Sequence, residues 1–218
     1  MTYEMIKKDP AINTYITHAD ATLEVLGYTE HSFAHVTKVA QTAGSLLQTL
    51  HYPQRTVELA KIAGYMHDIG NVVNRSEHSQ SGAVMAFRLL DRMGFAPEEI
   101  AVIVSAIGNH DEGTGVPVSA VAAALILADK SDVRRSRVRS KQTVTFDIHD
   151  RVNYSVTKSH LDVNAEQTQV ILELTVDTQF SPVMDYFEIF MNRMNLCRQA
   201  AKALGLEFKL TINGQSML

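Results

Sequence analysis

The sequence lacks the features that would place it in several specialised classes of protein. Its 218 residues include a single cysteine, Cys197, so no disulfide can form within the chain, which fits a reducing cytoplasm. The most apolar run, "VSAVAAALILA" at 118–128, is too short to span a bilayer. The opening "MTYEMIKKDP" has no apolar stretch of the kind found in a secretory signal. We therefore expect a cytoplasmic protein that does not enter a membrane.

A strong charge of either sign is also lacking. The formal net charge is -4, and charged residues make up 20% of the chain, so there is no general attraction to nucleic acid or to a membrane surface. Hydrophobic residues make up 45% of the chain, which is enough to bury a core. The composition predicts a globular protein that binds neither nucleic acid nor membrane.

Apolar residues recur at helical spacing through residues 1–140, with no alternation typical of strands. Asp9 and Pro10 carry the signals of a helix start, and Gly27 carries that of a helix end. Further helical patterns cover 30–50, 53–69, Ser79–Met93, Pro97–Gly108 and Val118–Arg134. The fold class is therefore mainly α, with a helical bundle as the first domain.

The period changes in residues 141–218, which we expect to form a small α+β unit. Alternating apolar residues predict strands in "TVTFDIHDRV" (143–152), "QVILELTVD" (169–177) and "LEFKLTI" (206–212). A helix over 182–204, with Ser181 as its cap, should cover this short sheet. Its flanking strands favour parallel pairing through a right-handed crossover. We expect the unit to pack on the bundle, to support assembly or the rim of a cleft, and to offer an open sheet edge to a homodimer.

Residues 64–70, "GYMHDIG", place a histidine and an aspartate in an apolar helical run, where both side chains are costly to bury without partners. A third polar residue of this kind, Asp129, follows the apolar stretch Leu125–Ala128. Divalent metals bind imidazoles and carboxylates that converge from several elements. The candidate ligands are His35, His67, Asp68, His78, His110 and Asp129. Taken singly, the histidines also fit a surface position, a helix start or a helix end.

Together these residues resemble the HD superfamily of metal-dependent phosphohydrolases. Its signature of a histidine, a His-Asp dyad and a later aspartate is matched by His35, His67–Asp68 and Asp129. The local contexts "HVTKVAQTA", "GYMHDIG" and "LADKSD" are also similar to those of the family. The resemblance covers about residues 30–135 and implies an HD-type helical bundle with phosphohydrolase activity.

Two further histidines refine the resemblance. His78 in "HSQSGA" and His110 in "IGNHDEGTG" match the extra histidines of subfamilies that hold two metals. The order of motifs is most similar to bacterial HD-type diadenosine tetraphosphate hydrolases, and more distantly to HD-GYP cyclic dinucleotide phosphodiesterases. The chain departs from the second group in Asn109 and in "GVP", and from the first in Asp111.

The resemblance implies one or two divalent ions and a metal-activated water. Asp68 would bridge the ions and would be catalytic together with His67. His35, His67 and Asp129 would complete one ion, while His78 and His110 would hold the other. A shell rich in histidine favours iron, manganese or zinc over magnesium, which prefers oxygen ligands.

Cations near Asp129 could bind the phosphates of a substrate. Lys130 and Arg134 are four residues apart, and we expect them to share one helix face as substrate-binding residues. The alternative is a solvated helix end favoured by the helix dipole. We assign that second role to Arg137 and Arg139.

The leading hypothesis is a metal-dependent phosphohydrolase that acts on a phosphate ester or anhydride of a small, nucleotide-like molecule. An alternative is a metal-stabilised, nucleotide-binding regulatory protein with little or no turnover. A third reading is a helical structural protein whose histidines are incidental, but it leaves two buried aspartates, Asp68 and Asp129, without partners.

Overall fold

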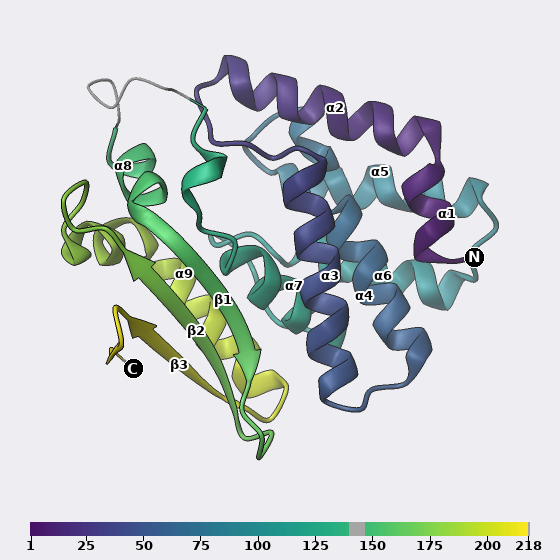
Figure 1. Cartoon of the computed structure of the whole chain (residues 1–218). Helices are drawn as coiled ribbons and strands as arrows, with labels where there is room; N and C mark the ends of the chain where they lie inside the picture. The colour runs from purple at the N-terminus through teal and green to yellow at the C-terminus, as the bar shows by residue number, and fades with distance from the viewer. Residues whose placement is uncertain (140–146, 218) are drawn as a thin grey trace.

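The N-terminal part of the protein is a bundle of helices (Figure 1). The structure is a computed structural model that describes residues 1–139 and 147–217. The bundle comprises α1 (Tyr3–Lys8), α2 (Pro10–Val25), α3 (Phe33–Thr49), α4 (Gln54–Met66), the short 3-10 helix η1 (Ile69–Val72), α5 (His78–Arg92), α6 (Pro97–Gly108) and α7 (Ala120–Lys130). The helical bundle expected from the periodicity is confirmed, with α1 as an additional short helix.

Local capping explains where several of these helices begin and end. The Asp9 side chain accepts hydrogen bonds from the amides of Ala11 and Ile12, each at 2.9 Å, and so satisfies two free donors at the start of α2. Gly27, just beyond α2, has a φ of 82°, a conformation that costs glycine little. The Ser119 side chain caps α7 in the same way, by accepting from the amide of Ala122 at 3.1 Å.

Helix α7 is the centre of the bundle. It packs against α3, α4 and α6, and against α9 (Val183–Ala203) of the C-terminal part. Every residue from Val121 to Ala128 is buried. Because other helices surround α7, its sequence can be apolar on every face. None of the helices formed by the described residues is long and apolar enough to cross a membrane.

The close approach of α3 and α4 depends on a glycine. A Cβ atom at Gly64 would lie 2.8 Å from the Cα atom and 2.9 Å from the backbone nitrogen of Ala40. Glycine therefore lets the two helix backbones come together at this point. The approach matters because α3 carries His35 and His67 follows directly on α4.

A second close approach involves Gly70, the last residue of "GYMHDIG". A Cβ atom there would overlap the carbonyl oxygen of His78 and the backbone nitrogen of Gly82. The start of α5 consequently packs directly on η1. The glycine thus fixes where His78 lies relative to the His67–Asp68 dyad.

The C-terminal part is a mixed sheet with helices around it. Its elements are η2 (Arg135–Arg137), α8 (Ile148–Ser155), β1 (Val156–Val163), β2 (Gln169–Val176), α9, β3 (Glu207–Ile212) and β4 (Gln215–Ser216). The strand order is β1-β2-β3-β4. The pairs β1–β2 and β3–β4 are antiparallel, whereas β2 and β3 are parallel. The parallel pairing of the strands that flank the long helix is confirmed, and with the two antiparallel pairs it makes the sheet mixed.

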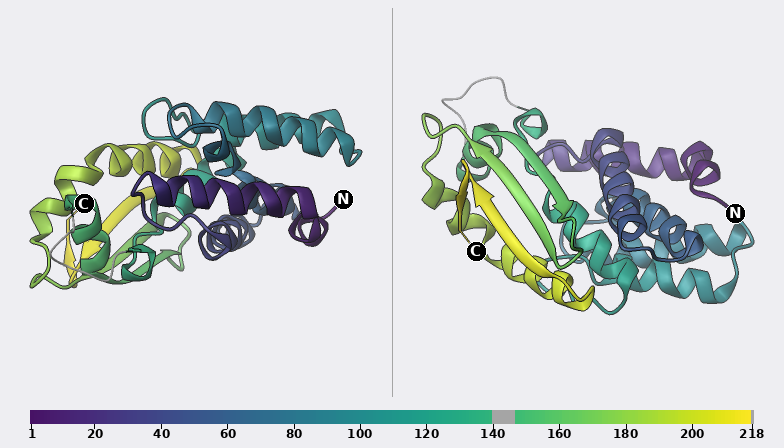
Figure 2. Two further views of the ribbon diagram at one scale, coloured as in Figure 1. Left: turned by 90° about the horizontal axis from the view of Figure 1, so that it is seen from above. Right: turned by 60° about the horizontal axis from the view of Figure 1, so that its bottom comes forward.

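Helix α9 covers one face of this sheet and passes behind the strands in the view of Figure 1 (see also Figure 2). The side chains that pack beneath it alternate along two strands and are buried: Val170, Leu172, Leu174 and Val176 on β2, and Phe208, Leu210 and Ile212 on β3. Because these strands have a period of two, their other face carries the polar residues and Ile171.

The strand expected at 143–152 is wrong in its second half. Residues 143–146 lie outside the described part of the chain, and 148–152 belong to α8. The side chain of Asp147 accepts a hydrogen bond from the amide of Asp150 at 2.8 Å and so starts a helix where the alternation predicted a strand. The sheet instead contains β1, whose exposed positions are polar and which carries little apolar alternation.

The expected cap of α9 is also wrong. Pro182 occupies the N-cap position, and the Ser181 hydroxyl donates to the Asp185 carboxylate at 2.8 Å. Ser181 therefore binds a side chain of the first turn and leaves the backbone amides of that turn uncapped.

We expect Gly64→Ala to lower the free energy of unfolding by about 1 to 3 kcal/mol, because the added methyl group meets the backbone of α3 and forces the helices apart. The matched control is Gly44→Ala in α3, where the three atoms nearest the new methyl group all belong to the side chain of Lys61, which has to shift. That control should keep the gain of about 1 kcal/mol from better helix propensity. Urea unfolding of both variants measures the difference. Equal stability of the two would contradict the proposed backbone contact.

Candidate metal centre

The six candidate ligand residues come together at one end of the helical bundle. They are contributed by helix ends: His35 lies in the first turn of α3, His78 is the first residue of α5, and Asp129 lies in the last turn of α7. His67 and Asp68 follow α4, and His110 follows α6. All four histidines are almost completely buried. The structure therefore brings together residues that are far apart in the sequence and that were grouped by their ligand chemistry and by the resemblance to the HD superfamily.

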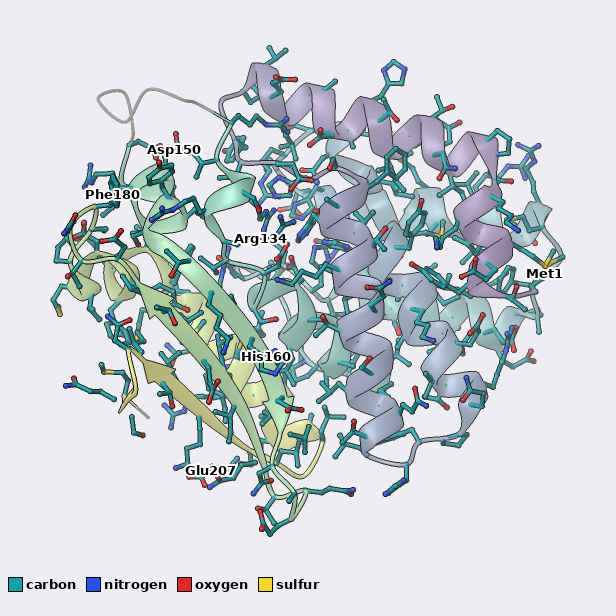
Figure 3. The ribbon with its side chains drawn as sticks, viewed as in Figure 1. Met1, Arg134, Asp150, His160, Phe180 and Glu207 are labelled. Carbon is teal, nitrogen blue, oxygen red and sulfur yellow. The ribbon has the colours of Figure 1, made fainter. Side chains whose placement is uncertain are left out.

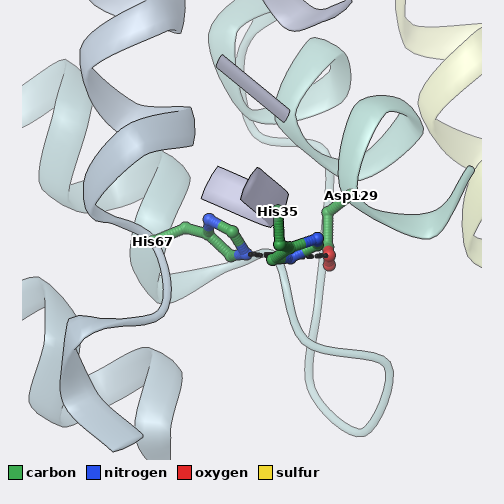
Figure 4. Close-up of side chains that lie close together, drawn as sticks. All are labelled: His35, His67 and Asp129. Atoms are coloured by element: carbon green, nitrogen blue, oxygen red, sulfur yellow. Dashed lines mark hydrogen bonds and ion pairs between the residues drawn. The ribbon is translucent and has the colours of Figure 1, made fainter. Parts of the chain in front are cut away.

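One group consists of His35, His67 and Asp129 (Figure 4). The Nε2 atom of His35 lies 3.3 Å from Nε2 of His67 and 3.3 Å from Oδ1 of Asp129. The Nε2 atom of His67 lies 3.6 Å from the same carboxylate oxygen. Atoms that bind one metal ion at about 2.1 Å lie about 3.0 to 3.4 Å from one another. The spacing of this group matches that requirement closely.

Asp68 lies between this group and a second pair of histidines. Its Oδ2 atom is 3.1 Å from Nε2 of His67 and 3.5 Å from Nε2 of His35. Its Oδ1 atom is 3.5 Å from Nε2 of His78. The Nε2 atoms of His78 and His110 lie 3.2 Å apart. One oxygen of Asp68 thus faces each group.

Hydrogen bonds on the outer side of the rings set the orientation of all four imidazoles. The Nδ1 atoms of His67, His110 and His78 lie 2.8, 2.6 and 3.1 Å from the backbone carbonyls of Gly64, Ile107 and Arg75. A carbonyl can only accept, so each Nδ1 carries the proton, and in a neutral ring the lone pair is on Nε2. Two such lone pairs at 3.2 Å repel each other unless a cation lies between them. The donor set therefore fits a divalent metal.

The electrostatics of the pocket point in the same direction. Burial lowers the pKa of His67, but the carboxylates of Asp68 and Asp129 outweigh it and raise that pKa to about 10. Burial raises the pKa of Asp68, yet its histidine neighbours hold that pKa well below its usual range. Burial and the nearby charge of His67 hold the pKa of His110 well below its usual value. The two aspartates thus stay ionised and favour a positive charge among them, which a proton on His67 supplies and a divalent ion could supply in its place. His110 stays in the neutral form that binds metal.

Asp132 is a part of this centre that the sequence analysis missed. It is fully buried, and its Oδ2 accepts from Nδ1 of His35 at 2.8 Å. Its Oδ1 lies 2.8 Å from Nζ of Lys38 and 2.9 Å from Nε of Arg134. Burial raises the pKa of Asp132, but its hydrogen bond to His35 and the nearby cations lower it more. Its position three residues after Asp129, in "LADKSD", was the only signal of this role.

A cavity of about 410 Å³ opens onto the centre. Its walls include Asp68, His78, His110 and Asp129, together with the cations Arg75, Lys130, Arg137 and Arg193. Elements of the C-terminal part, α8 and α9, supply another portion of the wall. The lining also includes the carboxylates Glu112, Asp147 and Asp150. The cavity therefore combines candidate metal ligands with charges of both signs, and its four cations are the groups that could bind an anionic ligand.

The expected substrate-binding pair is divided by the structure. Lys130 is buried in the cavity wall, with Nζ 2.7 Å from Oδ2 of Asp129. Helix α7 ends at Lys130, so the expectation that Lys130 and Arg134 share a helix face is wrong. Arg134 (Figure 3) instead pairs with Asp132 and Glu30 and does not belong to the lining of this cavity.

Arg137 was expected at a solvated helix end, and this expectation is also wrong. Only 5% of its surface is exposed, and its guanidinium donates to the backbone carbonyls of Glu30 and Asp132, each at 2.8 Å. Since Arg137 also lines the cavity, it adds positive charge near the centre. Backbone acceptors beyond the end of α7 hold it there, and a residue pattern does not reveal them.

Comparisons with known proteins give one family. The model of the HD domain family matches residues 32–154. An uncharacterized protein of Methanocaldococcus jannaschii is 25% identical over 198 residues, which cover 79% of this chain and 76% of that protein. The crystal structure of a predicted HD superfamily hydrolase from an uncultured Thermotogales bacterium is 23% identical, with a TM-score of 0.46, over 60% of this chain and 73% of that one. All six candidate ligand residues fall within the region that the family model matches, whereas α9 lies beyond it.

Asp132→Asn should weaken metal binding by about ten- to a hundredfold, because the amide keeps the shape but not the charge that orients His35. Competition with a chelator of known affinity measures the change. The matched control is Asp91→Asn, an exposed aspartate on α5, which should bind metal as the unchanged protein does. An Asp132→Asn variant with unchanged metal affinity would argue against a role for Asp132 in positioning His35.

Proposed function

The chain belongs to the HD domain family, and from that premise we propose that it is a phosphohydrolase that cleaves a phosphate ester or anhydride of a nucleotide-like molecule. Family membership supports divalent-metal binding and hydrolase activity in general. The observation that carries the proposal is the convergence of four inward-facing imidazoles around Asp68, at the wall of a cavity that four cationic side chains also line.

In this proposal His35, His67 and Asp129 hold one ion, His78 and His110 hold a second, and Asp68 is shared between them. Bound divalent cations supply hydroxide near neutral pH and neutralise charge that develops on phosphoryl oxygens.

Residues of the protein orient the candidate ligands and would bind the substrate. The outer hydrogen bonds keep each imidazole in the tautomer that binds metal. Lys130 places a positive charge at the cavity wall where phosphate oxygens would bind. We propose Asp68 and His67 as the catalytic residues because both lie beside each group of candidate ligands.

The chemistry of the donor set supports a transition metal. Four of the six candidate ligands are imidazoles, which suit iron, manganese or zinc better than magnesium. We propose two ions because each oxygen of Asp68 faces a separate group of histidines. Metal identity and number are both open to direct measurement.

Several finer expectations are also part of this proposal. We propose that the chain is functionally similar to diadenosine tetraphosphate hydrolases, on the basis of its two extra histidines, His78 and His110. We propose a boundary between an HD domain and a C-terminal unit near residue 140, where the bundle gives way to the part that contains the sheet. A homodimer and a cytoplasmic location stay predictions from the sequence.

The test of the proposed function is metal analysis of the purified protein, followed by a panel of nucleotide phosphate esters and anhydrides with added manganese, iron or cobalt. We expect metal-dependent turnover of at least one member, and its loss in Asp68→Asn. Asp91→Asn is the matched control and should retain activity. Binding of nucleotide without turnover would favour the regulatory alternative, and a protein that takes up no metal would contradict both.

His110→Ala should remove about one equivalent of metal and leave the fold intact, because the remaining group of His35, His67 and Asp129 is unaffected. Plasma emission spectrometry gives the metal content, and circular dichroism checks the fold. The control is His160→Ala on β1, whose side chain is 56% exposed (Figure 3). If both variants kept the metal content of the unchanged protein, the second ion would not be held by His110.

A further inference from the structure

The candidate ligands leave the role of α9 unexplained. This helix lies beyond the region matched by the HD family model, yet it packs against α7 as well as against the sheet (Figure 2). Arg193 in its middle lines the cavity of the metal centre. Its guanidinium lies 4.0 Å from the centre of the Phe190 ring on the same helix, a contact that holds the side chain in place.

Arg193 and Lys130 hold one carboxylate between them. The Nε atom of Arg193 donates to Oε1 of Glu112 at 2.8 Å, and Nζ of Lys130 lies 3.4 Å from the same oxygen. Lys130 in turn contacts Asp129, a candidate metal ligand, at 2.7 Å. Glu112 therefore connects the C-terminal unit to the metal centre through two cations.

The geometry resembles an anion site that is filled by the protein's own carboxylate. The Glu112 carboxylate lies within ion-pair distance of both cations, 2.8 Å from Arg193 and 3.4 Å from Lys130. Among the described residues, the bond from Nε is the one hydrogen bond of the Arg193 guanidinium. Most of its N–H donors are thus left for a ligand in the cavity, and the fork of an arginine suits phosphate as well as carboxylate.

We infer that Arg193 of α9, together with Lys130, binds a phosphate group of the substrate beside the metal centre, and that Glu112 holds this place in the free protein. The inference rests on the proposed function and extends it. It makes the C-terminal unit a part of the active site, because the unit supplies a residue that contacts the substrate. It also predicts that Glu112 competes with phosphate for the two cations.

The first test is the binding of inorganic phosphate to the manganese-loaded protein, measured by isothermal titration calorimetry. Arg193→Met should weaken binding by roughly ten- to a hundredfold, as expected for the loss of a charge-assisted contact. Arg198→Met is the matched control, since Arg198 is exposed on the same helix and does not line this cavity. Equal manganese content in all three proteins ensures that the metal centre is intact.

A second variant separates phosphate binding from a purely structural ion pair. Glu112→Gln removes the competing anion, so phosphate should bind several-fold more tightly, whereas Arg193→Met binds it more weakly. If the pair only supported the fold, both variants would change phosphate affinity in the same direction or not at all. Such a result, or no phosphate binding by the unchanged protein, would overturn the inference.

Turnover distinguishes failure of this inference from failure of the proposed function. If an ester of the panel is hydrolysed and its KM is the same in Arg193→Met and Arg198→Met, the inference fails while the proposed function stands. If phosphate affinity depends on Arg193 but no ester or anhydride is hydrolysed, the anion site stands and the proposed function fails.

Discussion

Several carboxylates lie largely out of water at one end of a helical bundle, and the rest of the structure depends on the positive charge held among them. Asp68 and Asp132 are buried, and Asp129 is nearly so. Because burying an unpaired ion is costly, each carboxylate needs a cation or several hydrogen-bond donors nearby. The ammonium group of Lys38 lies beside Asp132, and that of Lys130 lies beside Asp129. The imidazoles, with the divalent metal that they are suited to bind, would supply the positive charge between Asp68 and Asp129.

The positions of the candidate ligands at helix ends fit this need for nearby positive charge. Five of the six candidate ligands lie at or just beyond a helix end, and the sixth lies in the first turn of α3. A helix end is the place where a side chain can turn inward and where free backbone carbonyls are available as acceptors. Two of the four imidazoles, those of His67 and His110, use such carbonyls, and His78 uses the carbonyl of Arg75 in the segment before α5. The glycines at positions 64 and 70 then let the backbones come close enough for the rings to meet.

The sequence predicted the bundle from its helical periodicity. It predicted the grouping of the candidate ligands from ionisable residues in apolar surroundings and from the order of motifs that resembles the HD superfamily. It did not predict Asp132, whose role depends on a hydrogen bond to a residue 97 positions away. The sequence gives one indication that Arg193 points inward. It lies three residues after Phe190 and four before Cys197, which are both buried, so it shares their helix face. Arg134 was wrongly expected on the same helix face as Lys130, because the sequence did not show that α7 ends at Lys130. In residues 143–152 the alternation of apolar residues predicted a strand, whereas Asp147 caps the start of a helix. The sequence alone does not show which of these two signals prevails.

The division of the cavity wall between two parts of the chain has a consequence for how such a protein can diversify. The candidate metal ligands and their costly network of buried charges come from helices of the bundle, where almost any change disturbs several partners at once. The portion of the wall supplied by α8 and α9 carries no candidate ligand among its described residues. Apart from Arg193, which is linked to Asp129 through Glu112 and Lys130, substitutions there would change the shape of the cavity without removing a candidate ligand. The shape of this part of the cavity and the candidate metal ligands are thus encoded in separate stretches of the chain, which can change largely independently of each other.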